Sequence, residues 1–329
     1  MSRLGAVLRF ASGHRRLLGT VQVLALAAFL AGVGWALRGS FHAAADDLAH
    51  ANLVLFGLGC AALGGYYLVF VLGWMRILAE WGIRLSYPAA LRAEMLSMLA
   101  KYVPGGVWTP AARVVAARRA GVTDAALVTA SMLLEAGISA VAGVIVFVLG
   151  LPFVDDVHAP LVPLVAFGAV IAVLVQPRVF RPLAGKVLRR VGYRRELPQL
   201  RARTLTLLLC FYAGTWLLGG FALWLLVRSV GGHPEAASIV FLGGTAAAGA
   251  IVAVLFVFAP SGLGPREATM YGLLLALVTP GEALGAVALN RLALTVVELL
   301  LFVVGSVVLR GRGRAEPAEP AEPAELPSL

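Results

Sequence analysis

Several apolar stretches of about 20 residues constrain this chain most, because a helix of that length spans the hydrocarbon core of a bilayer. Of the 329 residues, 60% are hydrophobic and 13% are charged, whereas soluble domains carry about 25% charged residues. This composition excludes a soluble globular protein. We predict an all-α polytopic membrane protein, since helices satisfy every backbone polar group within lipid.

Six stretches are predicted to cross the membrane once each. Two further stretches, 89–117 and 236–278, are each broken by a cluster of proline and glycine, which ends one helix and starts another. Each is predicted to form a hairpin that returns to the side where it began. The longer second hairpin is either re-entrant or makes two full crossings, which gives six to eight transmembrane helices. The six simple spans are 17–37, 52–72, 125–149, 161–175, 205–227 and 283–309.

The distribution of basic residues predicts the orientation. Of the 27 Lys and Arg residues, four lie in 1–16, seven in 75–124, nine in 176–204 and three in the tail, and four lie elsewhere. The positive-inside rule makes these segments and both termini cytoplasmic. The scatter also argues against a single basic patch for nucleic acid. We predict a multi-pass protein of the cell inner (plasma) membrane, with 17–37 retained as a span rather than removed as a signal peptide.

Two regions resemble each other, which predicts an internal repeat. Residues 101–150 run from a Pro-Gly-Gly break to a span that contains Glu135, and residues 258–305 run from a Pro-Ser-Gly-Leu-Gly break to a span that contains Glu298. Three crossings per half invert the second half relative to the first, an arrangement typical of transporters. The predicted segments are a cytoplasmic N-terminus at 1–16, a first repeat at 17–149, an outer loop at 150–160, a second repeat at 161–309 with a basic cytoplasmic loop at 176–204, and a disordered Ala-Glu-Pro tail at 310–329.

Three ionisable residues within the spans are functional candidates, because a charge in lipid is costly. Glu135 and Glu298 each lie roughly 15 Å from the cytoplasmic end of their spans at a rise of 1.5 Å per residue. They either supply counter-charge or proton coupling, or they are structural partners that pair with Arg291 or with a carbonyl. Arg291 either forms a polar track with Glu298 or makes an interhelical salt bridge.

The hairpin breaks are the predicted anion sites. A helix that begins there directs free N–H groups and a partial positive charge toward a phosphate. Glu267 either holds Arg266 or acts as a proton-linked group, and Tyr102 and Trp108 either line the cleft or anchor the protein at the interface. The predicted ligand-binding residues are Lys101, Tyr102, Pro104, Gly105, Gly106, Trp108, Arg113, Gly262, Gly264, Arg266 and Glu267.

No catalytic residue, metal site or cofactor is predicted. The sequence contains no HExxH, GxxxxGK[ST] or GxSxG motif, and its five histidines lack metal-ligand spacing. Cys60 and Cys210 both lie in apolar runs, where cysteine behaves as a small hydrophobic residue.

The two break motifs carry a family resemblance. At KYVPGGVW from residue 101, followed by Arg113, Gly121 and Glu135, and at PSGLGPRE from residue 260, the sequence resembles the lysylphosphatidylglycerol synthase transmembrane family, also called flippase-like. The resemblance covers about residues 15 to 310. It implies a protein that moves or presents a lipid with an anionic headgroup, either a phospholipid or a polyprenyl phosphate.

The same resemblance leads us to expect a stand-alone member of that family. Only twenty residues follow Leu309, so the soluble synthase domain, and lysyl transfer with it, are not expected. Ser261 and Pro265 depart from the pattern of some relatives.

Three functions follow as hypotheses. The leading one is a bacterial flippase-like transporter whose partner is an anionic membrane lipid. The first alternative is a membrane glycosyltransferase with a polyprenyl-linked donor and with Glu135, Glu267 or Glu298 as base. The second is a non-transporting partner of a separate lipid-modifying enzyme.

Overall fold

The computed structural model describes residues 50–101, 108–154, 161–190, 193, 196–256 and 259–307. These parts of the chain are helical throughout, apart from turns, short 3-10 segments and connections. The predicted span at 17–37, both termini and residues 102–107 of the first break lie outside the described residues. The ten α-helices of the described part are α4 Leu53–Glu80, α5 Tyr87–Ala100, α6 Trp108–Arg119, α7 Ala125–Gly150, α8 Leu161–Val175, α9 Pro177–Arg190, α10 Ala202–Ser229, α11 Ile239–Leu255, α12 Pro265–Leu274 and α13 Pro280–Val307.

Five stretches of the described chain are long and apolar enough to cross a membrane. They are α4, α7, α10, α11 with the short turn before it, and α13. A sixth candidate is the pair α8 and α9, whose axes differ by 78°. The predicted span at 161–175 coincides with α8, and the structure adds that the basic segment after it begins with a helix, because the chain bends at the start of α9 and continues as a helix to Arg190.

Local sequence signals explain where the long helices begin. The side-chain oxygen of Asn52 accepts the N–H groups of Val54 and Leu55 at the start of α4. Asp124 does the same for Ala126 and Leu127 at the start of α7. These N-caps satisfy N–H groups that have no partner within the helix.

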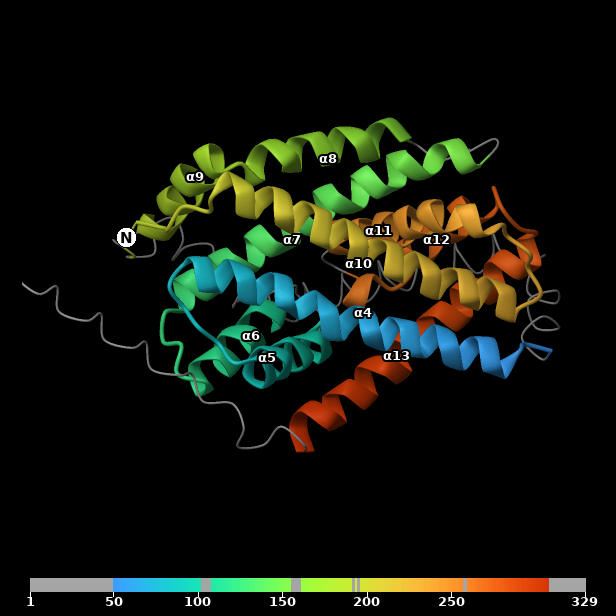
Figure 1. The fold of residues 1–329 in the computed structure, drawn as a ribbon, viewed down its shortest axis with the longest axis horizontal. Coiled ribbons are helices and arrows are strands. Elements are labelled where there is room, and N and C mark those ends of the chain that lie inside the picture. The colour runs from blue at the N-terminus through green and yellow to red at the C-terminus, as the bar shows by residue number, and fades with distance from the viewer. Residues whose placement is uncertain are drawn as a thin grey trace, which may run out of the picture.

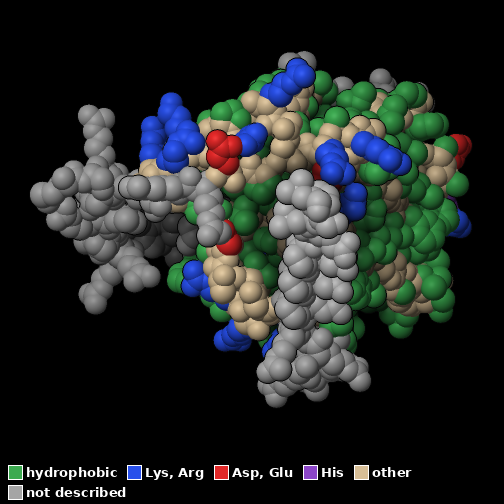
Figure 2. Space-filling view, turned by 60° about the vertical axis from the view of Figure 1, so that its left-hand side comes forward, with side chains coloured by type: hydrophobic (Ala, Val, Ile, Leu, Met, Phe, Trp, Pro, Cys, Tyr) green, Lys and Arg blue, Asp and Glu red, His purple; other side chains and the backbone are tan. Residues whose placement is uncertain are grey.

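The long helices alternate in direction, which defines two ends of the bundle. The backbone N–H of Asn52 donates to Ser229 O at 2.8 Å, so α4 begins where α10 ends. At the other end, the N–H of Arg201 donates to the side chain of Glu80 at 2.7 Å. We call this second end the basic end, because α9 lies there with its arginines (Figure 1). Figure 2 turns this end toward the viewer and shows Lys and Arg side chains around it, with hydrophobic side chains over much of the flank.

Two helix pairs occupy positions between the long helices. The pair α5 and α6, which we call hairpin 1, packs side by side in the half of the bundle nearest the basic end (Figure 1). The pair α11 and α12, called hairpin 2, begins from the opposite end, since Phe241 near the start of α11 lies against Gly150 at the end of α7. The second predicted break is confirmed, because α11 ends at Leu255 and α12 begins at Pro265. The Pro and Gly residues of the first lie outside the described residues, between α5, which ends at Ala100, and α6, which begins at Trp108.

Small residues allow α7, α10 and α11 to pack at very short range. A Cβ on Gly220 of α10 would overlap Gly243 N and Ile239 O and lie 2.7 Å from Gly243 Cα, and a Cβ on Gly143 would lie 2.6 Å from the Cβ of Ala247. In lipid, close approach of this kind drives helix association.

We therefore expect Gly220→Ala to lower the free energy of unfolding by about 1–3 kcal/mol, the cost of overpacking, since the obstructing atoms are backbone. Gly214→Ala is the matched control in the same helix, because a Cβ there meets no atom within 4 Å. Thermal unfolding in detergent micelles compares the two. Equal melting temperatures would contradict the packing argument.

Candidate functional site

Both predicted intramembrane glutamates lie inside the protein, and each accepts a hydrogen bond from a tyrosine. The Tyr67 hydroxyl of α4 donates to Glu298 of α13 at 2.6 Å. The Tyr212 hydroxyl of α10 donates to Glu135 of α7 at 3.2 Å. Glu298 and Glu135 are 2% and 3% exposed. Tyr67 lies halfway along α4, about 20 Å from either end at a rise of 1.5 Å per residue, so Glu298 is held near the middle of the bundle.

The ends of the two hairpin breaks meet beside Glu298. Lys101, directly after α5, forms an ion pair with Glu298. Its carbonyl oxygen accepts the backbone N–H of Ser261, in the break before α12, at 2.9 Å. Arg291 of α13 contacts the carbonyl of Ser261 at 3.4 Å and Glu267 of α12 at 3.3 Å. We call the group Tyr67, Lys101, Ser261, Arg266, Glu267, Arg291 and Glu298 the tip cluster.

Glu267 occupies the N-terminus of α12. One carboxylate oxygen accepts the N–H of Gly264 at 2.6 Å, and the other binds Arg291. Gly264 has a φ of 94°, a left-handed conformation that glycine adopts without strain. The carboxylate therefore takes the position at the helix start that was predicted for a phosphate.

Arg266 extends from the same turn into the protein. Its charge acts on Tyr66, Tyr67 and Lys101, and its aliphatic part lies against Gly249 of α11. Its Nε is buried and has no hydrogen-bond partner among the described residues. An unpaired buried donor is costly, so this guanidinium is well placed for an anion.

A second buried ion cluster lies within hairpin 1 and α7. Arg113 of α6 is 4% exposed and pairs with Glu94 of α5 and with Glu135, the latter at 2.5 Å. Its Nε lies 3.4 Å from the Ser97 hydroxyl, and its guanidinium lies over the Trp74 ring at 4.8 Å. We call Glu94, Arg113 and Glu135 the Arg113 cluster.

Several partners differ from those predicted. Neither glutamate pairs with Arg291, because Lys101 and Arg113 hold them and Arg291 binds Glu267. Glu267 likewise contacts Arg291 rather than Arg266. Arg113, expected beside the first break, is engaged inside the protein by two carboxylates. Trp108 lies at the start of α6 and is 43% exposed, and Tyr102, Pro104, Gly105 and Gly106 lie outside the described residues.

Sequence reasoning missed three partners of these charges, namely Tyr67, Glu94 and Tyr212. Glu94 had a signal, because it is an acid within the apolar helix that precedes the first break. The tyrosines had only a weak one, since tyrosine is common in spans and its partner lies on another helix. Tertiary pairing of this kind leaves no local spacing pattern.

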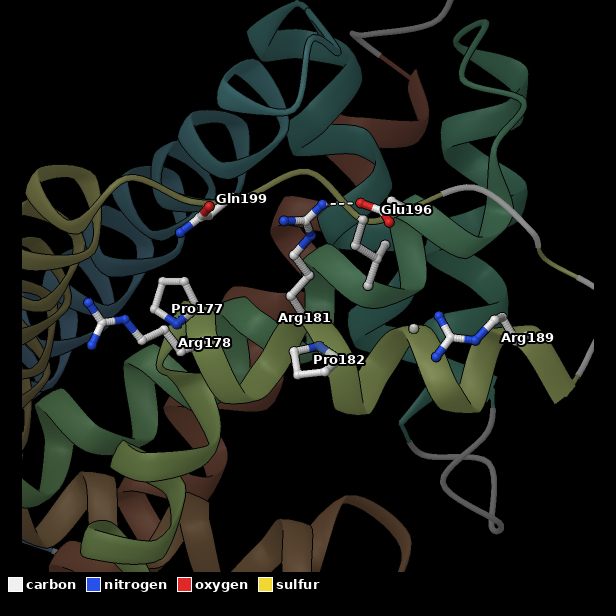
Figure 3. A pocket seen from close by; sticks show the side chains of 9 residues that line it. Pro177, Arg178, Arg181, Pro182, Arg189, Glu196 and Gln199 are labelled. Atoms are coloured by element: carbon white, nitrogen blue, oxygen red, sulfur yellow. Dashed lines mark hydrogen bonds and ion pairs between the residues drawn. The ribbon is translucent and has the colours of Figure 1, made fainter.

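Three cavities of more than 300 Å³ lie around these elements. Two apolar grooves of about 350 and 400 Å³ share Leu133, Gly137 and Ile171, and the second reaches Tyr66 next to the tip cluster. A third, polar cavity of about 470 Å³ lies between α9 and the segment around Glu196. Figure 3 shows it with Arg178, Arg181 and Arg189 along α9 and with Arg181 paired to Glu196. Among the described residues, no cluster of His, Cys, Asp or Glu has the composition of a metal site.

The fold and this site define a polytopic helical membrane protein with broken helices and buried ion pairs near its centre. Residues 22–301 match the family described as the lysylphosphatidylglycerol synthase TM region, and the chain belongs to that family. No curated protein matches the sequence.

Proposed function

We propose that the chain is an inverted repeat that carries an anionic lipid across the membrane. The tyrosine–glutamate pairs support the repeat, because the tyrosine of α4 binds the glutamate of α13 and the tyrosine of α10 binds the glutamate of α7. If α4 corresponds to α10 and α7 to α13, the two pairs exchange under one pseudo-two-fold rotation. The hairpins start from opposite ends, as such a rotation requires.

The observation that carries the proposal is the charge of the tip cluster. Lys101 pairs with Glu298 and Arg291 pairs with Glu267, and a third cation, Arg266, lies near Lys101. Among the described residues of the tip cluster this leaves one positive charge in excess near the middle of the bundle, and the buried Nε of Arg266 has no hydrogen-bond partner among them. A lipid phosphate supplies the missing negative charge and the acceptor, and arginine binds phosphate through two parallel hydrogen bonds.

The two apolar grooves, which share lining residues, are suited to bind the hydrocarbon chain of such a lipid. They run from the apolar face of α9 along α7 and α8 to Tyr66 and Trp216. A hydrocarbon chain lying there would place its headgroup within reach of the tip cluster. The arginines of α9 face the headgroup region of the leaflet that the positive-inside rule makes cytoplasmic, and they attract anionic lipid to that entrance.

The geometry favours transport over sugar transfer. A transferase base needs a carboxylate open to water and substrate. Glu135 and Glu298 are buried in ion pairs, and Glu267 binds Arg291 and caps α12. All three candidate bases are therefore occupied by structural partners.

The test is translocation of fluorescent phosphatidylglycerol in vesicles of phosphatidylcholine and phosphatidylglycerol that contain the purified protein. A membrane-impermeant quencher reports the labelled lipid left in the outer leaflet. We expect Arg266→Ala to slow translocation about tenfold or more, because a charge-assisted hydrogen bond contributes about 1.5–3 kcal/mol. Glu267→Gln removes one negative charge, which raises the net positive charge of the tip cluster by one, and this variant is expected to retain more anionic lipid through purification.

Arg228→Ala is the matched control. Arg228 lies over the Trp224 ring near the end of α10, at the end of the bundle opposite the basic end and away from the tip cluster. Translocation of labelled phosphatidylcholine, which has no net charge, tests whether the protein requires an anionic headgroup. Translocation that is equal in wild type, Arg266→Ala and protein-free vesicles would overturn the transport proposal. In that case, co-purification of a stoichiometric enzyme would favour the partner hypothesis.

A further inference from the structure

The Arg113 cluster holds more negative than positive charge. Glu94 and Glu135 both contact the guanidinium of Arg113, and the three side chains are 9%, 4% and 5% exposed. With both carboxylates ionised the cluster carries one uncompensated negative charge. Such a charge is costly inside protein, and two carboxylates that share a site do not both ionise readily.

Among the described residues, no second cation forms an ion pair with either carboxylate of the cluster. The Tyr212 hydroxyl donates to Glu135, and Trp74 is bonded to Ser131 rather than to either carboxylate. Where α13 packs on α5, Gly305 lies against Met95. The side chains that contact the cluster from the described elements around it are uncharged, namely Trp74 on α4, Ser97 on α5 and Tyr212 on α10. Arg266 lies near the neighbouring Tyr66, but neither carboxylate forms an ion pair with it.

The other glutamate site contrasts with this one. Glu298 also accepts a tyrosine hydroxyl, but it has a cation of its own in Lys101 and lies among further cations. Glu94 is thus the additional acid that distinguishes the Arg113 cluster. Within hairpin 2, α11 carries no ionisable residue at all.

We propose that the Arg113 cluster is a proton-binding site, in which Glu94 and Glu135 share one proton. The proton forms an O–H bond to one carboxylate oxygen, and the other carboxylate stays ionised and paired with Arg113. The two carboxyls titrate as a unit, so the proton belongs to the pair. Its release returns the proton to water and leaves the cluster with its excess negative charge.

The position of the site links the proton to movement of hairpin 1. Glu94 and Arg113 both belong to hairpin 1, whereas Glu135 belongs to α7. Separation of hairpin 1 from α7 leaves Glu94 and Arg113 as a neutral pair and removes the cation from Glu135. The docked and separated states therefore bind the proton differently, which makes it a coupling ion. This coupling rests on the proposed transport, whereas the proton site itself does not.

Infrared spectroscopy of the purified full chain tests the site without any transport. At neutral pH exposed carboxyls are ionised, so the carbonyl stretch of a protonated carboxylic acid reports a buried proton. We expect one such band in the wild type. Glu94→Gln and Glu135→Gln should each abolish it, because either change leaves one carboxylate paired with Arg113. Glu196→Gln, at an exposed ion pair, should leave it unchanged.

The wild-type spectrum tests the proton site even if a variant fails to fold. Absence of the band in wild type, or its persistence in both glutamine variants, would overturn the proton site. In vesicles, an imposed pH difference should change the translocation rate of labelled phosphatidylglycerol in wild type but not in Glu94→Gln. An equal response of wild type and Glu94→Gln to the pH difference would overturn the coupling of the proton to transport. Absence of translocation in both proteins would instead count against the proposed transport and would leave the infrared test of the proton site unaffected.

Discussion

Replacing Arg113 by methionine is expected to lower the free energy of unfolding by about 3–5 kcal/mol. The change removes the cation between Glu94 and Glu135 and leaves two buried carboxyls without counter-charge, which is the costly way to break a buried ion pair. The loss should shrink as the pH falls, because protonation of both carboxyls removes the uncompensated charge. Thermal and denaturant unfolding in micelles at acid and alkaline pH measures both effects.

Arg76→Met is the control for the Arg113 experiment. Arg76 is 57% exposed and lies 3.9 Å from Glu80, so its removal should change stability by no more than about 0.5 kcal/mol. Adding Glu94→Gln and Glu135→Gln to Arg113→Met makes the site neutral and should recover much of the lost stability. A loss from Arg113→Met that is as small as that from Arg76→Met would show that the cluster is not buried as described.

The second large effect is expected from Gly262→Ala in the break of hairpin 2. Gly262 has a φ of 66°, which costs a residue with a side chain about 1–2 kcal/mol. A Cβ there would overlap the Cβ of Ala253 and lie 2.7 Å from its Cα on α11, which adds about 1–3 kcal/mol of overpacking. Since Ser261 and Arg266 belong to the same turn, we expect most lipid translocation to be lost as well.

Two further variants separate this effect from a general sensitivity to alanine. Gly272→Ala in α12 meets no atom within 4 Å and should behave as wild type. Ala253→Gly removes the obstructing methyl group, so the double variant with Gly262→Ala should recover part of both stability and translocation, and the φ penalty should remain. Translocation of labelled phosphatidylglycerol and melting temperature are measured on all four proteins. Failure of Ala253→Gly to rescue would contradict the proposed overlap.

The sequence predicts the long helices well and their partners poorly. Hydropathy locates α7 at both ends and α4 at its start, because the apolar run is a local signal, whereas α4 continues to Glu80, beyond the predicted end at residue 72. The Pro and Gly clusters likewise predict both helix breaks. The bend between α8 and α9 was missed, since the apolar run and the basic segment after it fit a span and a loop equally well.

In the candidate site, too, the individual residues could be predicted from the sequence but their partners could not. Glu135, Glu298, Lys101 and Arg266 stand out because a charge in an apolar run is conspicuous. Their pairing depends on which helices become neighbours, and the residue that changes the charge balance, Glu94, lies on α5 only seven residues before Lys101. A helix end can be predicted from neighbouring residues, but an ion pair between distant helices requires the fold.

The crossed tyrosine–glutamate pairs have a consequence for how the chain is made. Residues up to α9 contain Tyr67, Lys101 and Glu135, whose partners Glu298 and Tyr212 are synthesised later. While the ribosome completes the later helices, the carboxylate of Glu298 that Tyr67 and Lys101 contact has not yet been made. These contacts can form only after α10 and α13 have been synthesised, so the last helices of the chain hold the earlier ones in their final places.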